Sequence, residues 1–249
     1  MSAATIEPHP LRHQVFLVRR AAASAIHVRH LPEVALEDAL PGIGDLEITI
    51  AHCFRQRGLP HGEAYVLSLV TAYLQPHRIF EIGTGTGEGT LLMARQAPAA
   101  RVDTLDLGTC VPTLGTQRGD PPLAGAAVGG AFRDSPCAPR ITQHLADSAR
   151  FDFSPFARRI DLVFVDGAHT AAYVANDSAA AFMMASPRGV VVWDDCHLYH
   201  PAIGRILRRW RRDGTQIFRI TGTRLAMWQS ELSPRRPQAA AVPRPKTTA

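Results

Sequence analysis

Residues 78–87 read Arg78-Ile79-Phe80-Glu81-Ile82-Gly83-Thr84-Gly85-Thr86-Gly87, a short apolar run that ends in three alternating glycines. A helical pattern follows through about residue 96, so the stretch predicts a buried strand, a tight turn and a helix. Glycine permits the backbone of a sharp turn and leaves room for a ligand, since a Cβ would collide with it. We therefore predict a nucleotide-binding loop, with the candidate contacts Glu81, Gly83, Thr84, Gly85 and Gly87.

The alternation of strand and helix continues along the chain. Apolar runs predict strands at 102–107, 141–145, 160–165 and 190–193, and helical spacing predicts helices at 63–74, 170–185 and 203–212. Two last strands, 216–221 and 224–228, are joined by the turn Gly222-Thr223. Apolar strands separated by helices predict an α/β fold. It is a Rossmann-like, doubly wound, mostly parallel sheet that is covered on both faces and has an antiparallel end.

The spacing of the glycines bears on the kind of ligand. A dinucleotide fingerprint is G-x-G-x-x-G, whereas this chain has G-x-G-x-G and carries Glu88 at the last fingerprint position. The pyrophosphate of NAD benefits from helix-terminal amides, whereas S-adenosylmethionine has no phosphate and presents an ammonium, a carboxylate and a sulfonium. Glu81, an acid two residues before the first glycine, favours the second ligand.

Acidic residues also follow the next two predicted strands. Asp106 and Leu107 end the second strand, where a carboxylate can accept both ribose hydroxyls of a nucleoside. Asp147 and Ser148 follow the third strand and are placed to meet an adenine amino group. Each acid alone is more often a helix cap or a turn residue. Together, at the ends of successive strands, they favour a ligand site.

With these motifs, residues 63–229 resemble a class I S-adenosylmethionine-dependent methyltransferase. Within that group they resemble the small-molecule O-methyltransferase-like families, of the catechol O-methyltransferase-like and methyltransferase 24 types. The most specific stretches are 81–87, 147–153 and 161–169. The resemblance implies a seven-stranded sheet in the order 3-2-1-4-5-7-6 with strand 7 antiparallel. It also implies S-adenosylmethionine as the cofactor and methylation of a hydroxyl on a small-molecule acceptor.

The reaction site is predicted after the fourth strand. Asp166 ends that strand and His169 follows three residues later, at the edge where ligands bind in such folds. Methyl transfer mainly requires alignment of a nucleophile and removal of its proton, and histidine removes protons near neutral pH. The resemblance implies a lysine base at this spacing, and the chain has His169 instead. We predict His169 as the catalytic residue; a metal ligand and a helix cap are the alternatives.

The resemblance also implies a divalent ion, held by the strand-four aspartate and an Asp-Asn pair after strand five. Alignment places Asp166 and Asp195 on the aspartates and Cys196 on the asparagine. Mg²⁺ prefers oxygen ligands, so a thiol weakens the match, although Asp194 or His197 can compensate. Asp166 and Asp195 are therefore candidate metal ligands. In the alternative, Asp166 contacts the cofactor and Asp195 orients the substrate.

Domain organisation follows from length and composition. The chain of 249 residues is 46% hydrophobic, which predicts one main domain. We expect an N-terminal appendage or lid at 1–60, a methyltransferase domain at 61–232 with an insertion loop at 108–140, and a disordered tail at 233–249. No apolar run is long enough to cross a bilayer or to form a signal-peptide core, and the four cysteines lie far apart. We expect a cytoplasmic protein with reduced thiols and no membrane contact.

Two other functions have less support in the sequence. An NAD-dependent oxidoreductase lacks support because the last fingerprint glycine and a Tyr-x-x-x-Lys pair are missing. A non-catalytic cofactor-binding or RNA-binding protein would use the arginines of 205–212, but such a run is more often a solvated helix face, and much of the net charge of +5 lies in the tail. The sequence does not identify the small molecule that accepts the methyl group, and it is compatible with a homo-oligomer. His197 and His200 are expected in solvent and Tyr173 in core packing.

Overall fold

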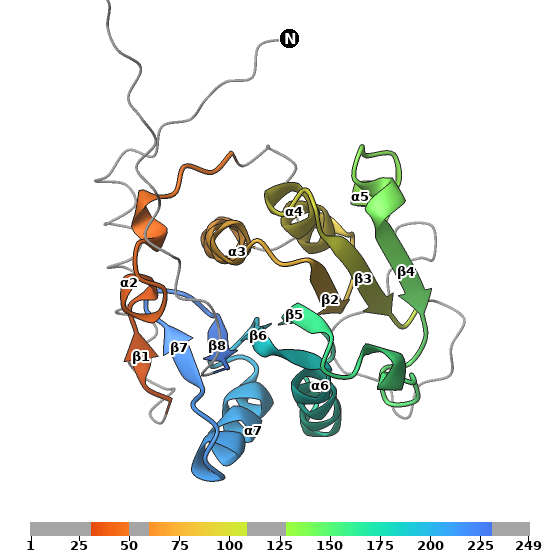
Figure 1. Ribbon diagram of the computed structural model, residues 1–249. Coiled ribbons are helices and arrows are strands. Elements are labelled where there is room, and N and C mark those ends of the chain that lie inside the picture. The colour runs from red at the N-terminus through yellow and green to blue at the C-terminus, as the bar shows by residue number, and fades with distance from the viewer. Residues whose placement is uncertain (1–30, 50–59, 109–127, 231–249) are drawn as a thin grey trace, which may run out of the picture.

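The computed structural model describes residues 31–49, 60–108 and 128–230. In these ranges the chain forms one eight-stranded sheet with helices on both faces (Figure 1). The strands are β1 (Glu33–Val34), β2 (Arg78–Ile82), β3 (Arg101–Asp106), β4 (Ile141–Leu145), β5 (Ile160–Val165), β6 (Ala185–Trp193), β7 (Phe218–Ile220) and β8 (Ala226–Gln229). The α-helices are α2 (Leu36–Ala39), α3 (His61–Leu74), α4 (Glu88–Gln96), α5 (Gly130–Arg133), α6 (Ala171–Met184) and α7 (Pro201–Arg212), and the short 3₁₀ turns are η1 (Ile43–Asp45), η2 (Ala138–Arg140) and η3 (Ser154–Phe156).

The strand order is β1-β7-β8-β6-β5-β2-β3-β4. β8 runs antiparallel to both of its neighbours, and the other described pairs are parallel. Without β1, and counted from the β4 edge, this is the predicted order 3-2-1-4-5-7-6, so the predicted fold class is confirmed. The expectation of seven strands is one too few, because the two residues of β1 pair with the edge of β7 and carry no periodic pattern of their own.

The sheet separates two hydrophobic cores. Helices α3 and α4 lie on one face of the sheet and α6 and α7 on the other (Figure 1). On β5, Leu162 and Phe164 belong to the core that contains α3 and α4, whereas Val163 and Val165 belong to the core that contains α6 and α7. Successive side chains of a strand point to opposite faces, so a strand buried on both faces must be apolar throughout. This requirement explains the continuous apolar runs that predicted the strands.

Most predicted elements agree with the structure to within a few residues, and β6 is the main exception. It begins at Ala185, five residues before the predicted start, and its register with β5 is irregular over the polar segment 186–188. Because that segment interrupts the apolar run, the sequence pattern does not indicate where the strand begins.

The predicted domain boundaries fall partly outside the described residues. The tail at 233–249, residues 1–30 and 50–59, and residues 109–127 of the insertion lie outside them. In the described part of the N-terminal region, Leu40 and Ile43 are buried in the core that contains α3. Among the described residues, no helix has the length and apolar character needed to span a membrane.

The register of the central strands positions the site. Ile82 of β2 pairs with Val165 of β5, and Val165 also pairs with Trp193 of β6. These three residues each end their strand, so the residues that follow them emerge side by side. Backbone hydrogen bonds extend the alignment, since Asp166 N donates to Ile82 O at 2.8 Å and Asp194 N donates to Val165 O at 3.0 Å.

Candidate functional site

The three glycines of the loop after β2 have different surroundings. A Cβ on Gly83, where φ is +104°, would lie 2.0 Å from the backbone oxygen of Asp166. A Cβ on Gly87, where φ is +87°, would lie 2.7 Å from Phe132 of α5. A Cβ on Gly85 would meet no atom of the described residues within 4 Å. Protein atoms therefore take up the space beside Gly83 and Gly87, and only Gly85 borders open space.

Glu81 and Thr84 support the loop from inside. The Glu81 carboxylate is buried and accepts hydrogen bonds from the hydroxyls of Thr90 and, at 2.5 Å, Thr104. Because Thr104 donates its hydrogen to Glu81, it accepts from Thr84 at 2.7 Å. Burial raises the pKa of Glu81 to about 7. The sequence did not single out Thr90 or Thr104, which complete this chain of hydrogen bonds.

Asp106 lies beside the open face of the loop. Its Oδ2 accepts a hydrogen bond from the amide of Gly85 at 2.9 Å, and its Oδ1 accepts from the amide of Gly108 at 3.2 Å. Asp106 and the adjoining Leu107 are both half-buried. The two amides fix the carboxylate at the end of β3, next to the position where a ligand can approach Gly85.

Asp147 follows β4 and has one unsatisfied oxygen. Its Oδ1 accepts from the amide of Ala149 at 2.9 Å, whereas its Oδ2 is buried without a hydrogen-bond partner among the described residues. A buried carboxylate oxygen without a donor is costly, so a donor from a bound molecule would stabilise it. The next residue, Ser148, is tied to α6: its carbonyl accepts from Asn176 Nδ2 at 3.0 Å, and its hydroxyl hydrogen-bonds to Asp177.

Three carboxylates gather after β5 and β6. One oxygen from each of Asp166, Asp194 and Asp195 lies within 4.8 Å of the others. Burial raises the pKa of Asp166 well above its usual value, and the charges of Asp194 and Asp195 raise it further. Burial also raises the pKa of Asp194 to about 6. The cluster therefore favours bound protons or a cation.

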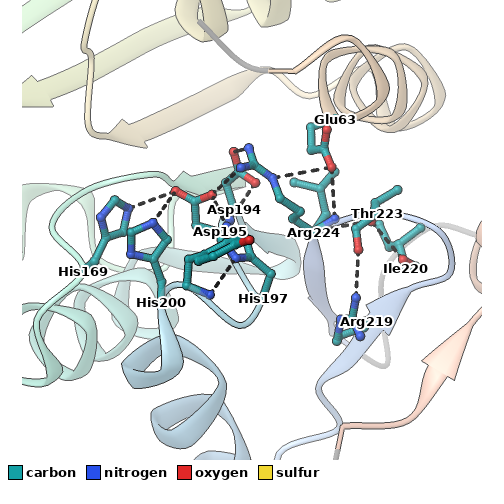
Figure 2. A network of polar contacts seen from close by, with 12 residues as sticks. Glu63, His169, Asp194, Asp195, His197, His200, Arg219, Ile220, Thr223 and Arg224 are labelled. Carbon is teal, nitrogen blue, oxygen red and sulfur yellow. Dashed lines mark hydrogen bonds and ion pairs between the residues drawn. The ribbon is translucent and has the colours of Figure 1, made fainter. Parts of the chain in front are cut away.

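Arg224, from the turn between β7 and β8, is the cation that reaches this cluster in the described structure (Figure 2). Its Nη1 lies 2.9 Å from Asp195 Oδ1 and its Nη2 lies 3.3 Å from Asp194 Oδ2. Its amide donates to the buried Glu63 of α3 at 3.1 Å. No motif in the sequence indicated Arg224 or Glu63, because their partners lie far away along the chain.

Asp195 also contacts three histidines (Figure 2). Its Oδ2 lies 3.0 Å from His169 Nε2 and 3.9 Å from His200 Nε2, and its Oδ1 lies 3.1 Å from His197 Nε2. Burial raises the pKa of Asp195, but hydrogen bonds from His169 and His197 and the charge of Arg224 lower it more, so the net pKa is below its usual range. The expectation that His197 and His200 are in solvent is wrong: their side chains are 17% and 30% exposed and face Asp195.

Two alternatives for the residues around the cluster can now be resolved. Thr170 caps α6, since its hydroxyl accepts from the amide of Tyr173 at 3.5 Å, so His169 is not the cap. Cys196 is fully buried in the hydrophobic core, and burial raises the pKa of its thiol to about 11. Asp194, rather than Cys196, is the neighbour of Asp195 that joins the carboxylate cluster.

A small pocket opens beneath this cluster. Asp166, His169 and Asp194 line its polar side, and apolar side chains that include Val174 and Trp193 line the rest. Its walls are therefore mostly apolar, with a few polar groups that belong to the carboxylate cluster and His169.

Comparison with known proteins agrees with this geometry. Residues 80–196 match a protein family described as a methyltransferase domain. The chain carries a methyltransferase domain. The match includes the glycine loop, Asp106, Asp147, Asp166 and Asp195, and it confirms the predicted activity, that of a methyltransferase. No match was found among curated protein sequences.

Solved structures share the fold of this methyltransferase. The O-methyltransferase TomG from Streptomyces achromogenes, involved in tomaymycin synthesis and solved with SAM, is 20% identical with a TM-score of 0.52, over 70% of this chain and 82% of that one. Cofactor-bound Rv0187 from MTB is 16% identical with a TM-score of 0.56, over 93% and 100% of the two chains. An O-methyltransferase from Bacillus cereus in complex with SAH is 13% identical with a TM-score of 0.54, over 91% and 94%.

Proposed function

We propose that this methyltransferase transfers a methyl group from S-adenosylmethionine to a hydroxyl oxygen of a small organic acceptor. The observation that carries the proposal is the buried, unpartnered Oδ2 of Asp147 at the same sheet edge as Asp106 and Gly85. The similar structures from Streptomyces achromogenes and Bacillus cereus, which are O-methyltransferases with SAM or SAH bound, support the choice of ligand and reaction.

Each part of the cofactor would meet a group of matching chemistry. The methionine end would approach Gly85, where the backbone borders open space. Asp106 would accept the ribose hydroxyls, and Leu107 would border the sugar. Asp147 would accept the adenine amino group through Oδ2, beside Ser148. Gly83, Gly87, Glu81 and Thr84 would shape the loop, and Asp166 would border the cofactor at the end of β5.

Bound S-adenosylmethionine supplies an electrophilic methyl group on a sulfonium. His169 would accept the proton of the acceptor hydroxyl while the oxygen bonds to the methyl carbon and the carbon–sulfur bond breaks, which leaves S-adenosylhomocysteine and the methyl ether. Asp195, 3.0 Å from His169 Nε2, would orient the imidazole and stabilise its protonated form.

A divalent ion such as Mg²⁺ fits the carboxylates of Asp166, Asp194 and Asp195. Their oxygens lie close together, and in the described structure Arg224 is the one arginine paired with Glu63, Asp194 and Asp195, so the four acids outnumber it. The ion would supply positive charge near the acceptor hydroxyl and lower its pKa. Isothermal titration with Mg²⁺ tests the site: Asp166→Asn should abolish saturable binding, and unchanged binding would exclude these ligands.

Calorimetric titration with S-adenosylhomocysteine tests the cofactor site. Asp106→Ala and Asp147→Ala should each weaken binding about tenfold or more, because each removes a charged acceptor. Asp103→Ala is the matched control, since Asp103 lies on the same strand and its carboxylate pairs with His144 at 2.9 Å. Absence of binding, or equal losses in all three variants, would refute the proposal, and binding of NAD instead would favour the oxidoreductase.

A screen of hydroxylated small molecules with S-adenosylmethionine tests the reaction. His169→Ala should retain S-adenosylhomocysteine binding but lose about a hundredfold or more in methyl transfer, as expected for loss of a general base. A variant with full activity would remove His169 from the mechanism and leave the cofactor assignment in place.

A further inference from the structure

We propose that His169, Asp195 and His200 form a second metal site, selective for Zn²⁺ and related transition metals, and that metal binding there inhibits methyl transfer. One ligand atom from each of these residues lies within 4.8 Å of the others. The set differs from the all-oxygen cluster of Asp166, Asp194 and Asp195, because two of its three donors are imidazole nitrogens.

The three donors are brought together by different parts of the chain. His169 lies between β5 and α6, Asp195 follows β6, and His200 immediately precedes α7 (Figure 2). Both histidines present Nε2 to the same oxygen, Asp195 Oδ2, at 3.0 and 3.9 Å. Tetrahedral Zn²⁺, with ligands at about 2.0–2.1 Å, needs donors about 3.3 Å apart, so these two separations lie within about 0.6 Å of the required value.

The other oxygen of Asp195 is held by separate partners. Oδ1 lies 2.9 Å from Arg224 Nη1 and 3.1 Å from His197 Nε2. Since His197 Nδ1 accepts from the amide of Tyr199 at 3.0 Å, its Nε2 carries the hydrogen that is donated to Asp195. Partners of this kind, which fix a carboxylate and leave one oxygen directed at the metal, are characteristic of metal sites.

Exposure and donor chemistry favour a bound transition metal. The side chains of His169, Asp195 and His200 are 23%, 14% and 30% exposed, so an ion can reach them and keep an open position for solvent. The imidazole rings of His169 and His200 are 3.8 Å apart between centroids, at an interplanar angle of 30°. Imidazole binds Zn²⁺ well, whereas Mg²⁺ prefers oxygen ligands.

Inhibition follows from the shared residues and rests on the proposed function. Zn²⁺ on His169 Nε2 places a positive charge on the imidazole and so disfavours proton transfer to the other ring nitrogen, Nδ1. Asp195 also cannot stabilise a protonated imidazole while its Oδ2 binds the metal. Zn²⁺ binding itself does not depend on that function, so the two claims can fail separately.

Calorimetry with ZnCl₂ on the metal-free full-length chain tests binding. Because the chain contains 11 histidines, the decisive quantity is the difference between variants. The wild type should bind about one Zn²⁺ more than His200→Ala and His200→Gln, and Co²⁺ should give tetrahedral absorption bands that both variants lose. His144→Gln is the control, because His144 forms a similarly exposed pair with Asp103 that no second histidine of the described residues joins. Excess Mg²⁺ should not displace the Zn²⁺.

Two results would overturn the site: equal Zn²⁺ binding by the wild type and both His200 variants, or loss of Zn²⁺ in Asp166→Asn but not in the His200 variants.

If methyl transfer is observed, Zn²⁺ should inhibit it, EDTA should restore it, and His200→Gln should raise the inhibitory concentration about tenfold or more. Inhibition that is unchanged in His200→Gln would refute the inhibitory role even if Zn²⁺ binds.

Discussion

At the scale of single residues, Gly83 and Gly85 stand two positions apart in one motif but meet different constraints. Both have positive φ, +104° and +50°. Only at Gly83 does the neighbouring strand end occupy the space of a Cβ, 2.0 Å from Asp166 O. The glycine motif therefore serves the packing of β2 against β5 as well as the approach of a ligand.

Alanine substitutions should separate these two roles. Gly83→Ala should lower the free energy of unfolding by about 3–5 kcal/mol, because backbone atoms must move. Gly85→Ala should cost only about 1–2 kcal/mol, the strain of a left-handed residue, but should weaken S-adenosylhomocysteine binding about fivefold or more. Urea denaturation and calorimetry measure the two effects. Similar stability losses in both variants would contradict the distinction.

At the scale of elements, α6 carries a buried acid that faces the loop after β4. Asp177 accepts a hydrogen bond from Asn176 Nδ2 at 3.0 Å and another from Ser148. Burial raises its pKa to about 6, and the nearby charge of Asp147 adds to the shift. The helix is thus coupled to the residues proposed to bind adenine through a group that titrates near neutrality.

This titration predicts a pH-dependent stability. Since the folded pKa of Asp177 is above the unfolded value, its stabilising contribution is complete below about pH 4 and is lost as the pH rises through about 6. Asp177→Asn removes the titration, so the stability difference between variant and wild type should shift in favour of the variant by up to about 2–3 kcal/mol between about pH 4 and 7. Urea denaturation across this range measures it, with the exposed Asp213→Asn as control. A difference that is independent of pH would refute the assignment.

At the scale of the whole molecule, two arginines connect distant parts of the chain. Arg224 joins the β7–β8 turn to α3 through Glu63 and to the end of β6 through Asp194 and Asp195. Arg219, 1% exposed, joins β7 to the N-terminal region through Glu33 at 2.7 Å. The antiparallel end of the sheet is therefore fixed to the reaction site by charge as well as by strand pairing.

Removal of the Arg224 charge should destabilise the fold. Arg224→Met leaves the acids that it contacts without their guanidinium, which should lower the free energy of unfolding by about 3–5 kcal/mol. Arg224→Lys keeps one charge but cannot contact both aspartates through two nitrogens, so its loss should be smaller. Chemical denaturation measures both variants. A loss below about 1 kcal/mol for Arg224→Met would show that the network contributes little.

The sequence patterns by themselves predicted most of the strands, the glycine loop and the acids at the strand ends, whereas the order of the strands came from the resemblance to a known family. These features are local: apolar runs report burial on both faces, glycine spacing reports a turn, and Asp106, Asp147 and Asp166 each directly end or follow a strand. β1 and the beginning of β6 escaped prediction because a two-residue strand and a polar interruption have no periodicity.

Only the tertiary structure decided how the side chains converge. Asp195 meets His169, His197, His200 and Arg224 because the register of β5, β6 and β8 aligns their ends, and no spacing along the chain encodes that alignment. The same holds for Gly83, whose need for glycine comes from a neighbouring strand, and for Cys196, which turns into the core while Asp194 joins the carboxylates. Contacts between residues far apart in sequence depend on the packed fold, and only the fold specifies them.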